Sequence, residues 1–498
     1  MLGLRQLIPS HRRLVGKWVK PFAGVDFQVK PLSASVPTLS YSMVSGGSKK
    51  RWSNPKVNIV RDSGGGPVVA SGLTTSWRTL ATKQDEPVSV SRIETNHEAK
   101  MLEVTWANGK TDIYPYVWLK DNCQCPTCFH PSSKSRIHLI QDLDVNIRPF
   151  TAELLGGSEQ IDITWTDGHR SSFRADWLYP RAFNSEQWDI RAPTYKMKRS
   201  YWGTDIMKNL PRASFHELLT EDSAVLAWLH QLEVYGFALV SGAPAKTGQV
   251  RALAERVAFI KRTHYGEDFS VIAKNDPSNV AYLDGPLQLH ADLPYYEYKP
   301  GVQFIHCIVQ YAGNGGDTRV TDAVHVARDL QRLFPEQYKI LTNTLVDWYD
   351  EGTDEMGEFI KVLQLPLICT DSKGEIWRIN FSQPQRDSFF PIPPEKVAAW
   401  YEAMTNYHNL LLDPQYCFQF KMVPGTILTF DNLRIVHGRS GYKTGFSERH
   451  IEGCYIDWDE VRSRRRVLEK KLGLAPRQWV TKIEEVTNIE EEKGRDSY

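Results

Sequence analysis

The chain has 498 residues, of which 24% are charged and 11% are aromatic, and its formal net charge is +1. This length allows two or more domains with a large buried core, and the near-zero net charge gives no electrostatic case for a nucleic-acid partner. No stretch approaches the roughly 20 consecutive apolar residues of a membrane-spanning helix, so we expect no membrane span.

Residues 1–87 are predicted to be a leader and linker. From Met1 to Arg61 the only acidic residue is Asp26, whereas basic residues recur throughout. A basic, acid-poor N-terminus is typical of a mitochondrial transit peptide, so we expect a mitochondrial location. The alternative is an unstructured basic tail on a cytoplasmic protein. The glycine-rich run 63–67 indicates a linker.

Residues 88–182 contain a short internal repeat that predicts a small β domain. The run TWANGK at 105–110 recurs as TWTDGH at 164–169, and each copy continues to an aromatic residue and then to Trp-Leu. Asn-Gly and Asp-Gly favour the tight turns of β-hairpins. The domain is therefore expected to consist of two related hairpins.

A cysteine cluster lies between the two copies of the repeat. The chain has seven cysteines, an odd number, and three of them lie within six residues: Cys123, Cys125 and Cys128. Such close spacing disfavours disulfides among them, whereas three thiolates and one imidazole form a structural zinc site. His169, at the second turn, is the expected fourth ligand, with His130 and His138 as alternatives. Reduced cysteines in a loop are the alternative without metal, and the ligand spacing does not match a DNA-binding finger.

Residues 183–472 are predicted to form the main domain. Helical spacing of apolar residues indicates helices over 222–235, ending at Gly236, and over 249–260. Buried or alternating strands are expected at 237–240, 302–309, 340–348, 376–381, 426–430 and 450–457. Many short strands after two helices predict a mainly β fold with helical buttresses, a double-stranded β-helix or jelly roll. Residues 473–498 are expected to be a charged tail, and Arg462–Arg466 a basic helical face in solvent.

His290 and Asp292 stand two residues apart, and residues i and i+2 of a strand point to the same face. A distant histidine, His437, would complete the two-histidine, one-carboxylate set of non-haem Fe(II) oxygenases. Arg449 follows twelve residues later, and its guanidinium can bind a carboxylate through two parallel hydrogen bonds. A lone His-X-Asp is often an ordinary polar pair on a strand, so the prediction of a metal site depends largely on His437 and Arg449.

Six blocks of the chain match one family together. They are WLKDNCQCPTC (118–128), HADLP (290–294), PGVQ (300–303), GGDT (315–318), RINF (378–381) and GCYIDW (453–458). Over about residues 90–472 the chain resembles the gamma-butyrobetaine and trimethyllysine dioxygenases, and the butyrobetaine branch more closely. The resemblance implies an N-terminal zinc domain, a double-stranded β-helix core and often a homodimer.

The same resemblance implies a reaction. It is the hydroxylation of gamma-butyrobetaine at C3 to L-carnitine by O2, with succinate and carbon dioxide as co-products. Fe(II) on His290, Asp292 and His437 would be the metal, 2-oxoglutarate the co-substrate and ascorbate the reductant. Arg449 would bind the distal carboxylate of 2-oxoglutarate, and Thr318 is similar to a residue that helps to hold it.

The family recognises its quaternary ammonium group with an aromatic cage, because ring faces attract a cation that cannot donate hydrogen bonds. The cage positions match Tyr265, Phe269, Tyr282 and Tyr455, and the two asparagines that hold the substrate carboxylate match Asn279 and Ser382. Phe269 stands where the family has tryptophan, and Ser382 where it has asparagine. Trimethyllysine or another quaternary amine therefore remains an alternative substrate. A zinc-stabilised interaction protein without catalysis would have lost an iron ligand or Arg449, and all four residues are present.

Overall fold

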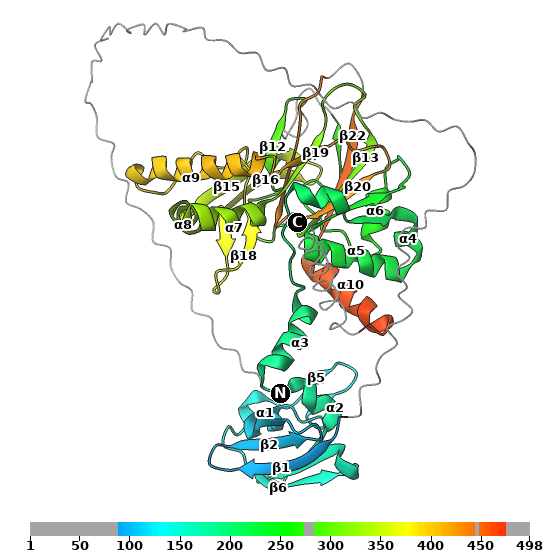
Figure 1. The fold of residues 1–498 in the computed structure, drawn as a ribbon, viewed down its shortest axis with the longest axis vertical. Helices are drawn as coiled ribbons and strands as arrows, with labels where there is room; N and C mark the ends of the chain where they lie inside the picture. Colours follow the sequence, from blue (N-terminus) through cyan, green and yellow to red (C-terminus); the bar gives the residue numbers. More distant parts are fainter. Residues whose placement is uncertain (1–87, 273–282, 444–447, 475–498) are drawn as a thin grey trace, which may run out of the picture. The chain divides into compact units, whose positions relative to one another are not determined.

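The computed structural model describes residues 88–272, 283–443 and 448–474 (Figure 1). The predicted leader, most of the predicted tail, Asn279 and Tyr282 lie outside these residues. Within the described ranges, no helix has both the length and the apolar character that a membrane crossing requires.

The N-terminal part contains two three-stranded antiparallel sheets. Their strands are β1 (Val90–Asn96), β2 (Met101–Trp106) and β3 (Thr111–Pro115), and then β6 (Pro149–Leu155), β7 (Gln160–Trp165) and β8 (Arg170–Arg174). The repeated motif forms the β2–β3 and β7–β8 hairpins, which confirms the prediction of two related hairpins. Gly109 and Gly168 occupy the left-handed region at the two turns, with φ of 81° and 82°, a conformation that glycine adopts without strain.

Short elements follow each hairpin. Helices α1 (Tyr116–Asp121) and α2 (Ala175–Leu178) end the two copies of the repeat, and the small strands β4 (Phe129–His130) and β5 (Ser135–Arg136) follow the cysteine cluster. Alternate residues of β2 and β7 are buried, and together they build one shared apolar core around Trp106 and Trp165. Helix α3 (Ser185–Tyr195) comes next.

Two sheets form the main β structure of the later part. One has the order β11-β22-β13-β20-β10-β9 and the other the order β12-β21-β14-β19. The first contains β9 (Arg212–Ser214), β10 (Phe237–Ser241), β11 (Asp268–Ile272), β13 (Val302–Val309), β20 (Ile427–Asp431) and β22 (His450–Ile456). The second contains β12 (Leu287–His290), β14 (Thr318–Asp322), β19 (Phe418–Phe420) and β21 (Ile435–Arg439). One pocket has lining residues from both sheets.

Helices cover the outer faces of these sheets. Helices α4 (Phe215–Thr220), α5 (Asp222–Tyr235), α6 (Gln249–Ala254) and α10 (Trp458–Lys471) share an apolar cluster with the six-stranded sheet. Helices α7 (Ala323–Leu333), α8 (Pro335–Asn343) and α9 (Pro394–Leu412) share another cluster with residues of β21 and β12. Two hairpins complete this part: β15 (Val346–Asp354) with β16 (Gly357–Leu365), and β17 (Ile368–Thr370) with β18 (Ile376–Ile379).

Most of the predicted elements are present, including α5 over the predicted 222–235 with Gly236 as its left-handed C-cap. Two predicted ranges are wrong in part. The helix predicted to reach residue 260 ends at Ala254, where the chain tightens into hydrogen bonds between residues three apart. The strand predicted from residue 340 begins only at Val346, because residues up to Asn343 belong to α8. A short apolar run does not distinguish a helix from a strand.

The basic face predicted around Arg462–Arg466 is not solvated as a whole. The Arg465 side chain is 1% exposed and lies 2.7 Å from the carboxylate of Glu233 and 2.9 Å from that of Glu469. Glu233 lies on α5, far away in the sequence. The local charge pattern of α10 therefore gave no sign of this partner.

Candidate active site

Three predicted metal ligands meet at the junction of β12 and β21. His290, the last residue of β12, pairs directly with His437 of β21. Asp292 follows in the bend after β12, so strand alternation explains the direction of His290 but not that of Asp292. Instead, Asn432 fixes the backbone of Asp292, since its side chain accepts from the Asp292 amide at 2.8 Å and donates to the Asp292 carbonyl at 3.0 Å.

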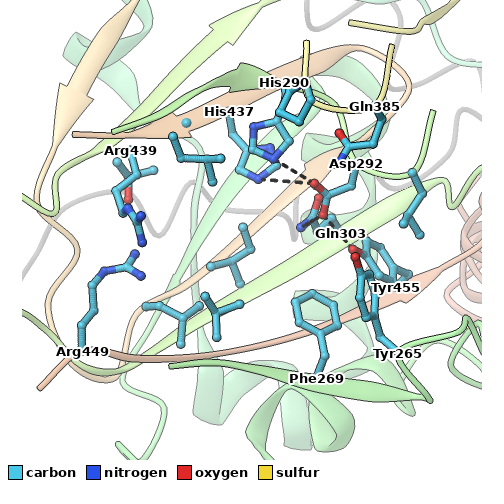
Figure 2. A pocket seen from close by; sticks show the side chains of 18 of the residues that line it. Tyr265, Phe269, His290, Asp292, Gln303, Gln385, His437, Arg439, Arg449 and Tyr455 are labelled. Carbon is cyan, nitrogen blue, oxygen red and sulfur yellow. Dashed lines mark hydrogen bonds and ion pairs between the residues drawn. The ribbon is translucent and has the colours of Figure 1, made fainter. Parts of the chain in front are cut away.

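The donor atoms of this triad have the spacing of a metal site. Asp292 Oδ1 lies 3.1 Å from His290 Nε2 and 3.9 Å from His437 Nε2 (Figure 2), and all three donor atoms lie within 4.8 Å of one another. Octahedral bonds of about 2.1 Å place neighbouring donors about 3 Å apart. The set therefore fits a hard or borderline divalent metal with only small adjustments.

Two further side chains hold the other oxygen of Asp292. Gln303 Nε2 donates to Oδ2 at 2.6 Å, and the Tyr455 hydroxyl donates to the same atom at 2.7 Å. This arrangement leaves Oδ1 directed toward the histidines. The Nδ1 atom of His290 lies 2.8 Å from the carbonyl of Gln288, which favours a proton on Nδ1 and a lone pair on Nε2.

The electrostatics keep these ligands in their metal-binding forms. Burial raises the pKa of Asp292, but the close imidazoles of His290 and, next, His437 lower it by more, so that this pKa lies well below its usual range. Burial, followed by the proximity of His290, lowers the pKa of His437 to about 3. At neutral pH the carboxylate is therefore ionised and His437 is neutral, and these are the forms that bind metals.

One end of the pocket carries two arginines. Arg449 and Arg439 both line it, and in Figure 2 their guanidinium groups face each other on the side of the metal ligands away from Phe269. Burial, followed by the charge of Arg439, lowers the pKa of Arg449 to about 10, so Arg449 remains a cation at neutral pH. Arg449 Nε has no hydrogen-bond partner in the described ranges. Thr318 of β14 also lines this pocket.

The other end of the pocket is aromatic. The ring of Phe269 lies 5.8 Å from that of Tyr265 and 5.3 Å from that of Tyr455, measured between centroids. All three line the pocket, together with Tyr295. Three of the four predicted cage residues therefore lie together, and the fourth, Tyr282, is outside the described residues.

Ser382 does not line the pocket. It is 2% exposed, and its hydroxyl donates to Oε1 of Gln385, which does line the pocket. Figure 2 shows Gln385 beside His290 and Asp292. Asn279, the other residue predicted to hold the substrate carboxylate, lies outside the described residues.

The cysteine cluster forms a second candidate metal site. His169 Nε2 lies 3.2 Å from the sulfur of Cys123, 3.7 Å from that of Cys125 and 3.5 Å from that of Cys128. A tetrahedral zinc ion with Zn–S bonds of about 2.3 Å and Zn–N bonds of about 2.0 Å requires sulfur–nitrogen separations of about 3.5 Å. The cluster therefore has the dimensions of a closed structural zinc site.

The two alternative fourth ligands are engaged elsewhere. The imidazole of His130 contacts the Ser133 hydroxyl at 3.0 Å, and that of His138 lies 3.1 Å from the carboxylate of Asp121. His169 is thus the only histidine that the described residues bring into the three-cysteine cluster.

Gln303, Arg439 and Gln385 line the pocket but were not predicted from the sequence. Gln303 ends the PGVQ block, and Arg439 stands two residues after His437, so strand periodicity could have placed both on the pocket side. Nothing in the local sequence distinguishes Gln385 from its neighbour Gln383.

Comparison with known proteins gives two family matches. Residues 193–455 match the model of the taurine catabolism dioxygenase TauD, TfdA family, and residues 93–179 match that of the gamma-butyrobetaine hydroxylase-like N-terminal domain. Human gamma-butyrobetaine dioxygenase is 36% identical, and the alignment covers 77% of this chain and 98% of the human protein. The enzyme of that name from Pseudomonas sp. is 30% identical, over 75% of this chain and 94% of its own. Mitochondrial trimethyllysine dioxygenase of Bos taurus is 27% identical, and the alignment covers 80% of this chain and 90% of the bovine protein.

Proposed function

Because this chain belongs to the gamma-butyrobetaine dioxygenase branch of the TauD/TfdA family, and is therefore a 2-oxoglutarate-dependent dioxygenase, we propose that it hydroxylates gamma-butyrobetaine at C3. The products are L-carnitine, succinate and carbon dioxide. One observation carries the proposal: a single pocket is lined by the metal triad, the half-buried Arg449 and three clustered aromatic rings.

In this proposal His290, Asp292 and His437 hold Fe(II), and Arg449 binds the distal carboxylate of 2-oxoglutarate. The unpartnered Nε of Arg449 and the neighbouring cation Arg439 fit a carboxylate group bound at this end of the pocket. Thr318 lies on the same wall. Fe(II) and 2-oxoglutarate, when bound, would activate O2, which is the oxidant of the reaction, and ascorbate would serve as reductant; protein side chains lack this chemistry.

The aromatic end is proposed to hold the trimethylammonium group. Tyr265, Phe269 and Tyr455 offer ring faces, each contributing about 0.5–2 kcal/mol to a desolvated cation, and Tyr282 is proposed as a fourth ring. The hydroxyl of Tyr455 is bonded to Asp292, so one residue connects the cation site to the metal site. Fixing the cation here determines which C–H bond of the substrate faces the metal.

Five finer assignments belong to the same proposal. The two facing sheets are proposed to be a double-stranded β-helix, preceded by a zinc domain in which Cys123, Cys125, Cys128 and His169 bind Zn(II). Domain limits of 88–182 and 183–472 are proposed on the same grounds. The resemblance also favours a homodimer, and the basic leader favours mitochondrial import.

The test is a turnover assay on the purified full-length protein with Fe(II), 2-oxoglutarate and ascorbate. Gamma-butyrobetaine and trimethyllysine are compared side by side, and carnitine and succinate are quantified by mass spectrometry. We expect one succinate per carnitine, loss of turnover in His290→Ala and normal turnover in His216→Ala, a control histidine that is exposed on α4. Hydroxylation of trimethyllysine in place of gamma-butyrobetaine would overturn the proposed substrate in favour of the alternative.

A further inference from the structure

The most informative feature outside the predicted site residues is Gln385, whose side chain lies at the pocket wall beside His290 and Asp292 (Figure 2). Its backbone is fixed: the Gln385 carbonyl accepts from the Tyr349 amide at 2.9 Å, on strand β15. Two residues later, the Asp387 amide donates to the Asp347 carbonyl at 2.9 Å. The segment is therefore held along β15, and Gln385 cannot move far from the pocket.

The amide of Gln385 is also oriented. The buried hydroxyl of Ser382 donates to Oε1 of Gln385. An amide group has one acceptor oxygen and two N–H donors. With the oxygen engaged by Ser382, the Nε2 group is the part of the side chain available to a ligand, and it has no hydrogen-bond partner among the described residues.

A donor at this position suits a carboxylate. The aromatic rings of Tyr265, Phe269 and Tyr455 form one part of the pocket, and in Figure 2 Gln385 lies on the other side of Asp292 from Phe269. A short zwitterion with its cation against the rings can therefore direct its anionic end toward Gln385. An N–H donor to a carboxylate makes a charge-assisted hydrogen bond, which is stronger than a neutral one.

We infer that Gln385, oriented by Ser382, is a specificity-determining residue that binds the carboxylate of the substrate. This inference rests on the proposed function, and it names the substrate class as short trimethylammonium carboxylates. Ser382 is a positioning residue, because it acts through Gln385 and does not line the pocket. An ammonium group next to the carboxylate, as in trimethyllysine, would meet the hydrogens of Nε2 and is selected against.

The experiment compares gamma-butyrobetaine with its alcohol analogue, 4-trimethylammonio-1-butanol, which retains the cation and lacks the carboxylate. Binding of both is measured by calorimetry on full-length protein loaded with Mn(II) and 2-oxoglutarate without oxygen, and turnover is measured separately with Fe(II). In Gln385→Leu we expect the affinity for gamma-butyrobetaine to fall about 10- to 100-fold, the range of a hydrogen bond to a charged group. The affinity for the alcohol stays within about threefold, since the ring contacts are unchanged.

Ser382 is tested by a double-mutant cycle. Ser382→Ala alone is expected to weaken gamma-butyrobetaine binding about three- to tenfold, because the Gln385 amide is then free to rotate. In the Gln385→Leu background, Ser382→Ala is expected to cause no further loss of gamma-butyrobetaine affinity. Gln383→Leu is the matched control, because Gln383 is exposed and does not line the pocket. Mn(II) affinity and thermal unfolding, measured for every variant, identify any general damage to the fold.

The outcomes separate this inference from the proposed function. Absence of carnitine in the turnover assay would refute the proposed reaction, whereas the carboxylate-over-alcohol preference in the binding assay still decides the role of Gln385. A wild-type protein that binds the acid and the alcohol equally would overturn the inference. So would a folded Gln385→Leu variant that keeps the wild-type preference.

Discussion

Replacing Tyr455 with phenylalanine tests whether one residue serves both the metal and the cation. The substitution removes the hydroxyl that donates to Asp292 Oδ2 at 2.7 Å and keeps the ring that lies 5.3 Å from Phe269. Metal affinity should therefore fall, while the affinity for a quaternary ammonium ligand should change little.

The size of the effect follows from the contacts on Asp292. A hydrogen bond to a charged group contributes about 1.5–3 kcal/mol. Gln303 still donates to the same oxygen at 2.6 Å, so we expect a loss of about 1.5 kcal/mol in the free energy of metal binding, which is about a tenfold weaker metal affinity. Tyr455→Phe combined with Gln303→Leu should weaken metal binding further than either single change, because Oδ2 then loses both donors.

The assay is an anaerobic titration of the metal-free protein with Mn(II), followed by calorimetry. Tyr416→Phe is the matched control: its hydroxyl donates to Asp329 at 2.6 Å, the same kind of bond to a carboxylate that is not part of the metal triad. We expect normal Mn(II) affinity in the control. Unchanged Mn(II) affinity in Tyr455→Phe, together with a large rise in the KM for the quaternary amine, would refute the reasoning.

Three other predictions concern the two ends of the pocket and the cysteine cluster. Phe269→Trp should lower the KM for gamma-butyrobetaine about two- to fivefold without a new product, since indole is the better cation site; an unchanged KM in steady-state kinetics would contradict it. Arg449→Met should raise the KM for 2-oxoglutarate on the order of 100-fold and that for gamma-butyrobetaine by less than about threefold, since it removes a two-pronged charged contact; parallel increases would count against that role. His169→Ala should lose its bound zinc, as measured by elemental analysis, and should unfold at a lower temperature. His138→Ala should keep its zinc. The reverse result would make His138, not His169, the fourth zinc ligand.

The sequence was most informative where chemistry restricts the residue type. Histidine, aspartate and cysteine at metal-ligand spacing indicate their purpose before any fold is known, so both candidate metal sites could be predicted. Long elements with a clear period, such as α5, were also predictable. The residues that orient the ligands were not, because the partners of Gln303 and Gln385 depend on how separate segments are brought together. Arg465 belongs to this second group, since its partner Glu233 lies on another helix.

Strand β22 explains how one short stretch of sequence contributes to both the proposed co-substrate end and the aromatic end of the pocket. Side chains two residues apart on a strand share a face. Ile451 and Tyr455 of β22 line the pocket, and so does Arg449, which directly precedes the strand. Gly453 continues this series. It pairs with Phe269 on β11, and a Cβ at Gly453 would lie 2.4 Å from the Phe269 ring, so the absence of a side chain makes room for that ring.

The other face of the same strand packs against helices. Cys454 and Ile456 belong to the apolar cluster that includes α5, α6 and α10, so the register of β22 is fixed by burial on that side. A slip of one residue would turn every pocket residue of the strand toward the helices. The helical packing therefore sets, through one strand, the relative positions of the proposed co-substrate anchor, the aromatic cage and the hydroxyl that holds Asp292. The fold therefore fixes the distances between Arg449, the aromatic cage and the Tyr455 hydroxyl. A substrate of different length would require a change in residues outside β22.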